Sequence, residues 1–157
     1  MTARFGSILL ASATLAIGAT SLHAQPGRLA KPTRTPWAGC DSGEFCIYEH
    51  SNGTGYYASF DRGTDNLNDP KVFARKLNDK TSAVWNRDVD PWCIYENATT
   101  NPNPGHIVMI RPGFKGSISR LVARDDRRFH WNDKVSRVRK ARYVNPPLVP
   151  AAAHFEC

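Results

Sequence analysis

Residues 45–49 read FCIYE and residues 92–96 read WCIYE, so an aromatic residue precedes the same tetrapeptide twice. A second pair of segments is interleaved with them: residues 77–84 read LNDKTSAV, and residues 131–138 read WNDKVSRV. The members of the first pair begin 47 positions apart, and those of the second pair begin 54 positions apart. This A-B-A-B order indicates an internal duplication of about 50 residues, and a duplication of that kind sets the architecture.

The first element of each copy alternates in the manner of a half-buried strand. In the first copy, Phe45 and Ile47 fall on one side of such a strand, and Cys46 and Tyr48 fall on the other. Residues 50–55 are rich in turn formers and lead into a second apolar run, which predicts a tight hairpin. No segment shows sustained helical periodicity, so the sequence predicts an all-β fold.

The hairpin of the second copy has a longer turn. Residues 97–105 include Pro102 and Pro104, which lack amide donors, and we expect this loop to stand off the sheet. The second element of each copy supplies a polar turn and then a short strand, expected over residues 82–85 and 136–138.

The first residues have the order of a secretory signal peptide. Arg4 precedes an apolar stretch over residues 5–19, and a short polar run then ends at Ala24. An uncleaved membrane anchor is the weaker alternative, because the apolar core is shorter than the roughly 20 residues that span a bilayer. We expect cleavage after Ala24, no later membrane span, and a monomer that is secreted to the extracellular space or the periplasm.

Export decides how the cysteines are interpreted. An oxidising compartment favours two disulfides over a metal site, and no pair has the spacing of a zinc knuckle. Four cysteines allow three pairings, and the sequence alone does not choose between them. A local loop can close over the Ser-Gly between the first two cysteines, so we favour Cys40–Cys46 together with Cys93–Cys157.

Composition and the repeat together predict one small domain with extended ends. The ends are rich in proline, and the stretch between them is the right length for a single domain. The predicted divisions are a signal peptide (1–24), a Pro-rich extended N-terminal segment (25–39), a domain (40–144) made of repeat one (40–88) and repeat two (89–144), and a Pro/Ala-rich C-terminal tail (145–157).

The repeated pattern resembles the Greek-key motif pair of βγ-crystallin-like domains. In that pattern an aromatic residue is followed by six residues and a glycine, as from Tyr48 to Gly55, and an Asn-Asp-x-x-Ser turn comes later. Residues 40–49 and 77–82 are more specifically similar to the secreted bacterial peptidase inhibitors typified by the Streptomyces metalloproteinase inhibitor. The resemblance covers about residues 40–144. It implies a disulfide-bearing Greek-key sandwich of two repeated motifs and, for function, inhibition of a protease.

The second copy departs from the family pattern. The stretch from Tyr95 to Gly105 is three residues longer than its counterpart, and no paired cysteine precedes Trp92. Residues 41–45 and residues 97–105 are both candidate reactive loops, and the sequence assigns the role to neither.

The paired Asn-Asp-Lys-x-Ser turns are candidate calcium sites, because related crystallin domains hold calcium with such turns. Calcium takes six to eight oxygens, and each turn offers one carboxylate, one amide and one hydroxyl. The final Ser of the pattern is Ala83 in one copy and Arg137 in the other, so we expect weak binding. The alternative is that these side chains bond their own backbone and that no cofactor is required. The residues concerned are Asn78, Asp79, Ser82, Asn132, Asp133 and Ser136.

Positive charge is concentrated in the second copy. Residues 111–142 contain eleven Lys or Arg against three Asp, a balance of +8, whereas residues 25–110 contain nine against ten, a balance of −1. Such a patch suits an acidic envelope component or an acidic protein cleft, and the alternative is a solvated surface. Nucleic acid is not expected, because no recognition motif for it is present. The candidate contact residues are Arg137, Arg139, Lys140 and Arg142.

Catalytic motifs are missing from the sequence, so we predict a binding protein and not an enzyme. The chain has no Gly-x-Ser-x-Gly elbow, no paired-histidine zinc motif and no phosphate-binding loop. Three functions remain open: inhibition of an extracellular protease, a weak calcium-binding role in an envelope structure, and a toxin-like action of a basic, surface-active protein.

Overall fold

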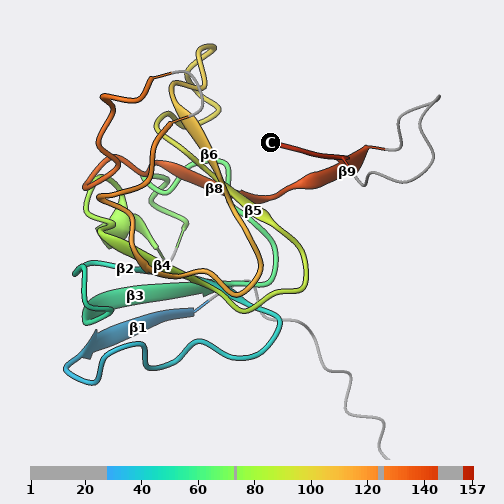
Figure 1. Ribbon diagram of the computed structural model, residues 1–157. Helices are drawn as coiled ribbons and strands as arrows, with labels where there is room; N and C mark the ends of the chain where they lie inside the picture. The colour runs from blue at the N-terminus through green and yellow to red at the C-terminus, as the bar shows by residue number, and fades with distance from the viewer. Residues whose placement is uncertain (1–27, 73, 124–125, 145–153) are drawn as a thin grey trace, which may run out of the picture.

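The structure is a computed structural model, and it describes residues 28–72, 74–123, 126–144 and 154–157. The predicted signal peptide, residues 1–24, lies outside the described residues (Figure 1). Within the described ranges, no helix is long and apolar enough to cross a membrane. The helical structure in those ranges is a single 3-10 turn, Arg75–Leu77.

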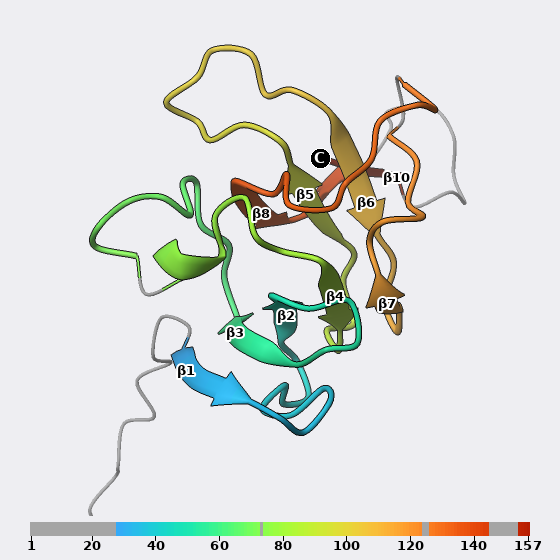
Figure 2. The same cartoon turned by 90° about the vertical axis from the view of Figure 1, so that its left-hand side faces the viewer.

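The first sheet has five antiparallel strands in the order β1-β3-β2-β4-β7 (Figures 1 and 2). Strands β2 and β3 form the predicted hairpin of the first copy, and β4 follows the first Asn-Asp turn, as predicted. The strand bounds are β1 Arg28–Thr33, β2 Phe45–Tyr48, β3 Gly55–Phe60, β4 Ala83–Asn86 and β7 Lys115–Ser117.

The second sheet has the order β6-β5-β8 and is built from the second copy. Its strands are β5 Trp92–Tyr95, β6 Ile107–Ile110 and β8 Arg137–Lys140. The two copies also exchange segments: β7 of the second copy pairs with β4, and Thr64 of the first copy pairs with Val138 of β8. This exchange produces a Greek-key sandwich of two repeats, which confirms the predicted fold class.

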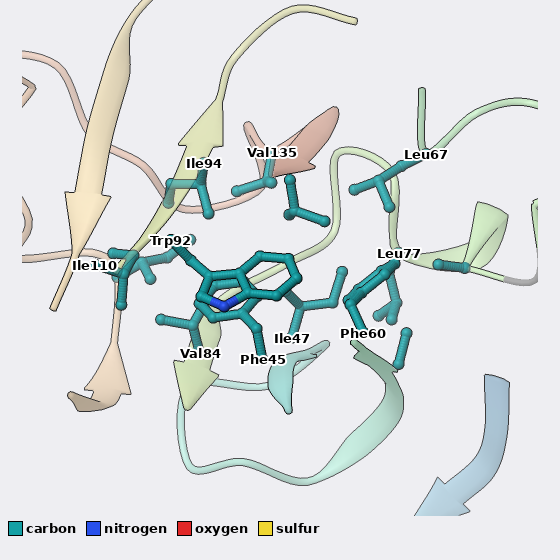
Figure 3. Packing of buried hydrophobic residues seen from close by; sticks show 14 of the residues in the cluster. Phe45, Ile47, Phe60, Leu67, Leu77, Val84, Trp92, Ile94, Ile110 and Val135 are labelled. Atoms are coloured by element: carbon teal, nitrogen blue, oxygen red, sulfur yellow. The ribbon is translucent and has the colours of Figure 1, made fainter. Parts of the chain in front are cut away.

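The core lies between the two sheets. It contains the residues that lie on the inward face of each strand for which the sequence predicted alternation. At its centre the rings of Phe45 and Trp92 stack with their centroids 4.9 Å apart and their planes 8° apart (Figure 3). Ile47 of β2 and Ile94 of β5 are fully buried beside them. Equivalent residues of the two copies thus pack against each other, and each fully buried aliphatic or aromatic side chain contributes about 1.5–3 kcal/mol.

The outward side of β2 is also buried, which the alternation did not predict. Tyr48 and Cys46 are covered by the segment that precedes β2, where Trp37 contacts Tyr48 edge-on at 5.2 Å. Trp37 adopts a φ of 61°, and its backbone amide donates to the Gly53 carbonyl at 2.8 Å. The N-terminal segment therefore forms a second apolar layer on the first sheet.

The folded body extends beyond the predicted domain boundaries of 40 and 144 at both ends. Strand β1 pairs with β3 along the edge of the first sheet. Strand β10, His154–Glu156, pairs with β9, Arg142–Val144, and the Cys157 that follows is bonded to Cys93. Parts of the two segments that composition predicted to be loose or extended thus belong to the β structure.

Candidate functional site

One end of the sandwich holds the two hairpin turns, and the same contact closes both. In the first hairpin, the Tyr56 amide donates to the Glu49 carboxylate at 3.0 Å, and in the second the His106 amide donates to the Glu96 carboxylate at 3.2 Å. The glycine before each of these amides, Gly55 or Gly105, has a positive φ. The base of both hairpins is therefore equivalent, and the three extra residues of the second loop lie outside it (Figure 2).

The two Asn-Asp turns lie at this same end and brace each other across the repeats. The Ser136 hydroxyl donates to Asp79 at 3.1 Å, and the Ser82 hydroxyl donates to Asp133 at 3.2 Å. The backbone amide of each aspartate also donates to a carbonyl of the other repeat. Both aspartates have φ values near 50°, a left-handed conformation that Asn and Asp tolerate better than most residues.

The oxygens of these turns fit calcium in part. Each site brings one carboxylate and one hydroxyl, from different repeats, to within hydrogen-bond distance of each other. The Asn78 side-chain oxygen is buried and accepts no hydrogen bond, whereas the amide groups of Asn78 and Asn132 donate to the neighbouring aspartates at 2.6 and 2.7 Å. The side chains supply fewer than six oxygens, so main-chain carbonyls or water must complete the shell of a bound ion.

The predicted basic patch is not a free cationic surface. Arg139 donates to Asp65 at 2.8 Å, and Arg137 approaches the same carboxylate at 3.6 Å while its guanidinium stacks on Tyr95. Lys140 pairs with two other aspartates. Of the four patch residues, only Arg142 has no ion pair within the described part of the chain. The charge excess of the sequence is therefore largely neutralised here by acidic residues from elsewhere in the chain.

The opposite end of the sandwich holds the connection between β4 and β5, residues 87–91, which we call the Val89 loop. Asn86 anchors it: its side-chain amide donates to the carbonyls of Asp90 and Ile110, both at 3.0 Å, and its side-chain oxygen accepts from the Asp88 amide. Because Asn86 is fully buried, these bonds hold the base of the loop in one conformation.

Asp88 braces the loop from inside. Its side chain is 4% exposed, accepts from the Trp92 indole at 2.9 Å and contacts the Lys140 ammonium at 2.7 Å. Burial raises the pKa of Asp88, but the bonds from Lys140 and Trp92 outweigh burial and hold it below its usual value. Burial lowers the pKa of Lys140, and the two aspartates beside it raise it above its usual value. Both groups therefore stay charged over a wide pH range.

The side chain at the tip of this loop faces solvent. Val89 is 86% exposed, more than the two other large hydrophobic residues that are exposed in the described ranges, Val122 and Tyr143. Single exposed apolar residues are common on protein surfaces. Val89 differs in that its loop is held by the buried Asn86 and Asp88.

Two neighbouring turns support the Val89 loop. The Gly43 amide donates to the Arg87 carbonyl at 2.9 Å, and the Arg87 amide donates to the Glu44 carbonyl at 2.8 Å, so the candidate loop 41–45 adjoins this site. On the other side, the Gly113 amide donates to the Asn86 carbonyl at 2.9 Å. The other candidate loop, residues 97–105, lies at the far end of β5.

The two disulfides have the favoured pairing, Cys40–Cys46 and Cys93–Cys157. The first closes the ring that contacts Arg87, because the Arg87 side chain donates to the Cys40 carbonyl at 2.6 Å. Cys40 and Cys46 also lie close to the Glu44 carboxylate, but cysteines in a disulfide are not thiolate metal ligands. No free cysteine is present among the described residues.

The sequence-based interpretation missed Val89. Its neighbours gave a signal, because Asn, Asp and Pro at positions 86, 88, 90 and 91 favour self-bonded turns. The alternation of apolar residues gave no signal for Val89, because the exposure of one valine depends on where the loop projects from the folded domain.

Known proteins agree with this architecture. Residues 33–106, a little under half of the chain, match the peptidase inhibitor family I36, a family of inhibitors and not of enzymes. No curated protein matches the sequence significantly. A solved structure described as "Evolution of the eye lens beta-gamma-crystallin domain fold" superposes with a TM-score of 0.50 at 18% identity, covering 65% of this chain and 89% of its own.

Two further solved structures are similar to a lesser degree. A βγ-crystallin from an archaeon has a TM-score of 0.46 at 21% identity, covering 64% of this chain and 99% of its own. A βγ-crystallin from Ciona intestinalis has a TM-score of 0.46 at 15% identity, covering 62% and 99%. Residues 33–106 are thus similar to peptidase inhibitor family I36, and the domain that contains them has the βγ-crystallin fold.

Proposed function

We propose that the protein inhibits a peptidase by inserting the Val89 loop into the cleft of that enzyme, with the Val89 side chain in an apolar specificity pocket. The exposure of Val89 on a loop fixed by buried Asn86 and Asp88 is the observation that supports this assignment. A loop held in one conformation loses little entropy on binding, which favours tight binding and resists cleavage.

The site also has the support that an inhibitory loop requires. The Val89 loop is bonded to the 43–44 turn through Arg87 and to β8 through Lys140. Asn86, at the base of the loop, is bonded to the 113–114 turn, so three separate segments restrain it. The match of residues 33–106 to a peptidase inhibitor family supports a protease as the partner. We infer further that the target has an apolar pocket, as thermolysin-type metalloproteinases do, and that one monomer binds one enzyme molecule.

Val89→Asp should weaken inhibition by about 100-fold or more, because it removes the apolar contact and places a charge in the pocket. Purified protein with intact disulfides would be titrated against a thermolysin-type and a subtilisin-type peptidase. Val122→Asp is the matched control: it also changes an exposed valine, 49% exposed, away from the loop, and it should leave inhibition unchanged.

The thermal midpoints of both variants should match that of the unaltered protein. Equal loss of inhibition in both variants would contradict the role of Val89. Inhibition of neither peptidase by the unaltered protein at micromolar excess would contradict the proposed function.

A second candidate function is weak calcium binding at the two Asn-Asp turns, favoured by the carboxylate–hydroxyl pairs and the unpartnered Asn78 oxygen. A dissociation constant of about 1 mM, ordinary for extracellular modules, implies that about 10 mM calcium adds roughly 1.4 kcal/mol to the free energy of unfolding. The thermal midpoint should then rise by about 3–5 °C relative to protein in chelator. An equal rise in magnesium, or no rise, would count against a calcium site.

We also propose that the protein acts outside the cytoplasm, in keeping with its two disulfides and its inhibitor family. The toxin-like alternative is not favoured, because three of the four residues of the basic patch are paired with aspartates.

A further inference from the structure

We infer that the open edge of β6 binds an extended peptide segment of a partner protein, which adds to the second sheet as an antiparallel strand and places a basic side chain beside Glu156. Strand β6 ends the second sheet, with β5 as its neighbour on the other side (Figure 2). The site shares no residue with the Val89 loop, so this inference goes beyond the proposed inhibition and does not depend on it.

The backbone of β6 presents polar groups along its outer edge. The Glu96 amide donates to the His106 carbonyl at 3.0 Å, so these two residues form a hydrogen-bonded pair of the antiparallel ladder. Bonded and non-bonded pairs alternate along such a ladder. By the observed register, Ile107 and Met109 fall in non-bonded pairs and direct their amides and carbonyls away from β5. No hydrogen bond from another segment to these groups is found within the described ranges.

The first repeat shows what an edge of this kind accepts. Strand β3 is the counterpart of β6, because the carboxylate contact at the hairpin base aligns Tyr56 with His106. In β3, residues 57–59 pair in antiparallel register with residues 28–30 of β1. Their counterparts in β6 are residues 107–109, and no strand of the described structure pairs with their outer edge. This edge of β6 is therefore the open equivalent of the position that β1 occupies.

The other edge strands of the two large sheets have features that oppose the addition of a strand. Strand β1 contains a lysine and a proline and pairs irregularly with β3, and β7 has three residues and begins with Lys115. Strand β8 carries three cations and is bridged by Thr64. Charge, proline, irregularity and short length at an edge all hinder further pairing. Strand β6, with the sequence IVMI, has no charge, no proline and a regular register.

A groove of about 440 Å³ runs along the open edge. Residues 107–109 all line it, and successive residues of a strand point to opposite faces, so the groove follows the edge of β6 and not one face. Met109 and Phe155 belong to the apolar cluster on the outer face of the second sheet, and Val122 adds an exposed apolar side chain. The groove can therefore cover apolar side chains on both faces of an added strand.

The charge of the groove indicates the chemistry of that strand. Among the described residues that line the groove, Glu156 alone is charged, and it is exposed. Arg142 lies opposite Glu156 across β9 and β10, yet the two side chains form no ion pair. Residues directly opposite each other in a sheet share a face, so a basic residue opposite Met109 would enter the groove that Glu156 lines. The occupant is thus an apolar extended segment with a basic residue at this position.

The probe for the test is an acetylated and amidated peptide with the sequence of residues 28–33, because β1 pairs with the counterpart edge. In the register of β1, its arginine lies opposite Met109, its leucine opposite Val108 and its alanine opposite Ile107. The probe should shift the amide NMR signals of residues 107–109 and 155–157 in isotope-labelled protein with intact disulfides. We expect a dissociation constant of about 0.1–1 mM, because a short free peptide loses much conformational entropy on binding.

N-methylated probes test the register on the unaltered protein. The amide of the probe residue opposite Ile107 points at β6, whereas the amide of the residue opposite Val108 points away from it. N-methylation of the probe's alanine should weaken binding by about 10-fold or more, and N-methylation of its leucine by about twofold at most. Equal effects of the two changes would overturn the addition of the peptide as a strand.

Two protein variants test the edge and its charge. Met109→Pro removes an outward amide and no bond to β5, and it should weaken binding of the probe by about 10-fold or more. Glu156→Lys should weaken binding by about twofold to fivefold, as expected for an exposed ion pair, and should favour a probe in which glutamate replaces arginine. Thermal midpoints establish that both variants are folded.

Three results would contradict the inference. If the probe at about 5 mM leaves the signals of residues 107–109 unchanged, the edge does not accept a strand. If the arginine and glutamate probes bind the unaltered protein equally, the assigned charge of the partner is wrong. If sedimentation without peptide shows a dimer that Met109→Pro dissociates, a second copy of the chain and not a partner peptide occupies the edge.

Discussion

Trp92→Ala is expected to lower the free energy of unfolding by about 3–5 kcal/mol, the usual loss for truncation of a buried Trp. Trp92 is fully buried and stacks on Phe45, so its removal leaves a cavity at the contact between the two repeats. Domains of this size are stable by only about 5–15 kcal/mol, so the variant should be partly unfolded near physiological temperature. Urea denaturation followed by circular dichroism measures the loss.

The variant Trp92→Phe separates packing from hydrogen bonding. It keeps an aromatic ring against Phe45 but removes the indole donor that Asp88 accepts at 2.9 Å. The expected loss is about 1–2 kcal/mol, and inhibition should weaken as well, because Asp88 holds the Val89 loop. If Trp92→Ala costs less than about 1 kcal/mol, the core is not organised around the Phe45–Trp92 stack.

Gly63→Ala is expected to cost about 2–4 kcal/mol, because the first repeat passes very close to β8 at this point. A β-carbon at Gly63 would lie 2.2 Å from the Val138 carbonyl oxygen and 2.6 Å from the Arg139 α-carbon. These are backbone atoms of a paired strand. They can move only by breaking the bonds between Thr64 and Val138, which are 2.7 and 3.2 Å long.

Gly116→Ala is the matched control for this prediction. Gly116 lies in β7, which pairs with β4 in the first sheet. An added β-carbon there would lie 3.8 Å from a Phe114 side-chain atom, which is an ordinary contact. Its expected effect is within about 0.5 kcal/mol, measured by the same denaturation. Equal losses in the two variants would show that the close approach at Gly63 does not limit stability.

The repeated segments made much of the fold predictable. The FCIYE and WCIYE segments became β2 and β5, and the strands after both Asn-Asp turns appeared within about one or two residues of their expected positions. Strand β1 was not predicted as a strand, because Pro32 and the lack of alternation remove the local signal. It exists because β3 offers an open edge.

The site was less predictable because it depends on distant pairs. Arg137 and Arg139 alternate as expected on one face of β8, yet the sequence does not show that Asp65, more than 70 positions earlier, neutralises them. Lys140 likewise forms an ion pair with Asp88, which lies about 50 positions earlier in the sequence. Tertiary contacts of this kind removed one predicted surface and created the braced loop that presents Val89.

The reciprocal Asp–Ser bonds between the repeats have an implication for the symmetry of the domain. Asp79 accepts from Ser136, and Asp133 accepts from Ser82, so each repeat supplies one aspartate and one serine to these bonds. Two separate single-repeat polypeptides related by a two-fold axis would form the same two bonds, as in an isologous dimer. The internal contact between the repeats thus has the form of an isologous interface with both partners in one polypeptide.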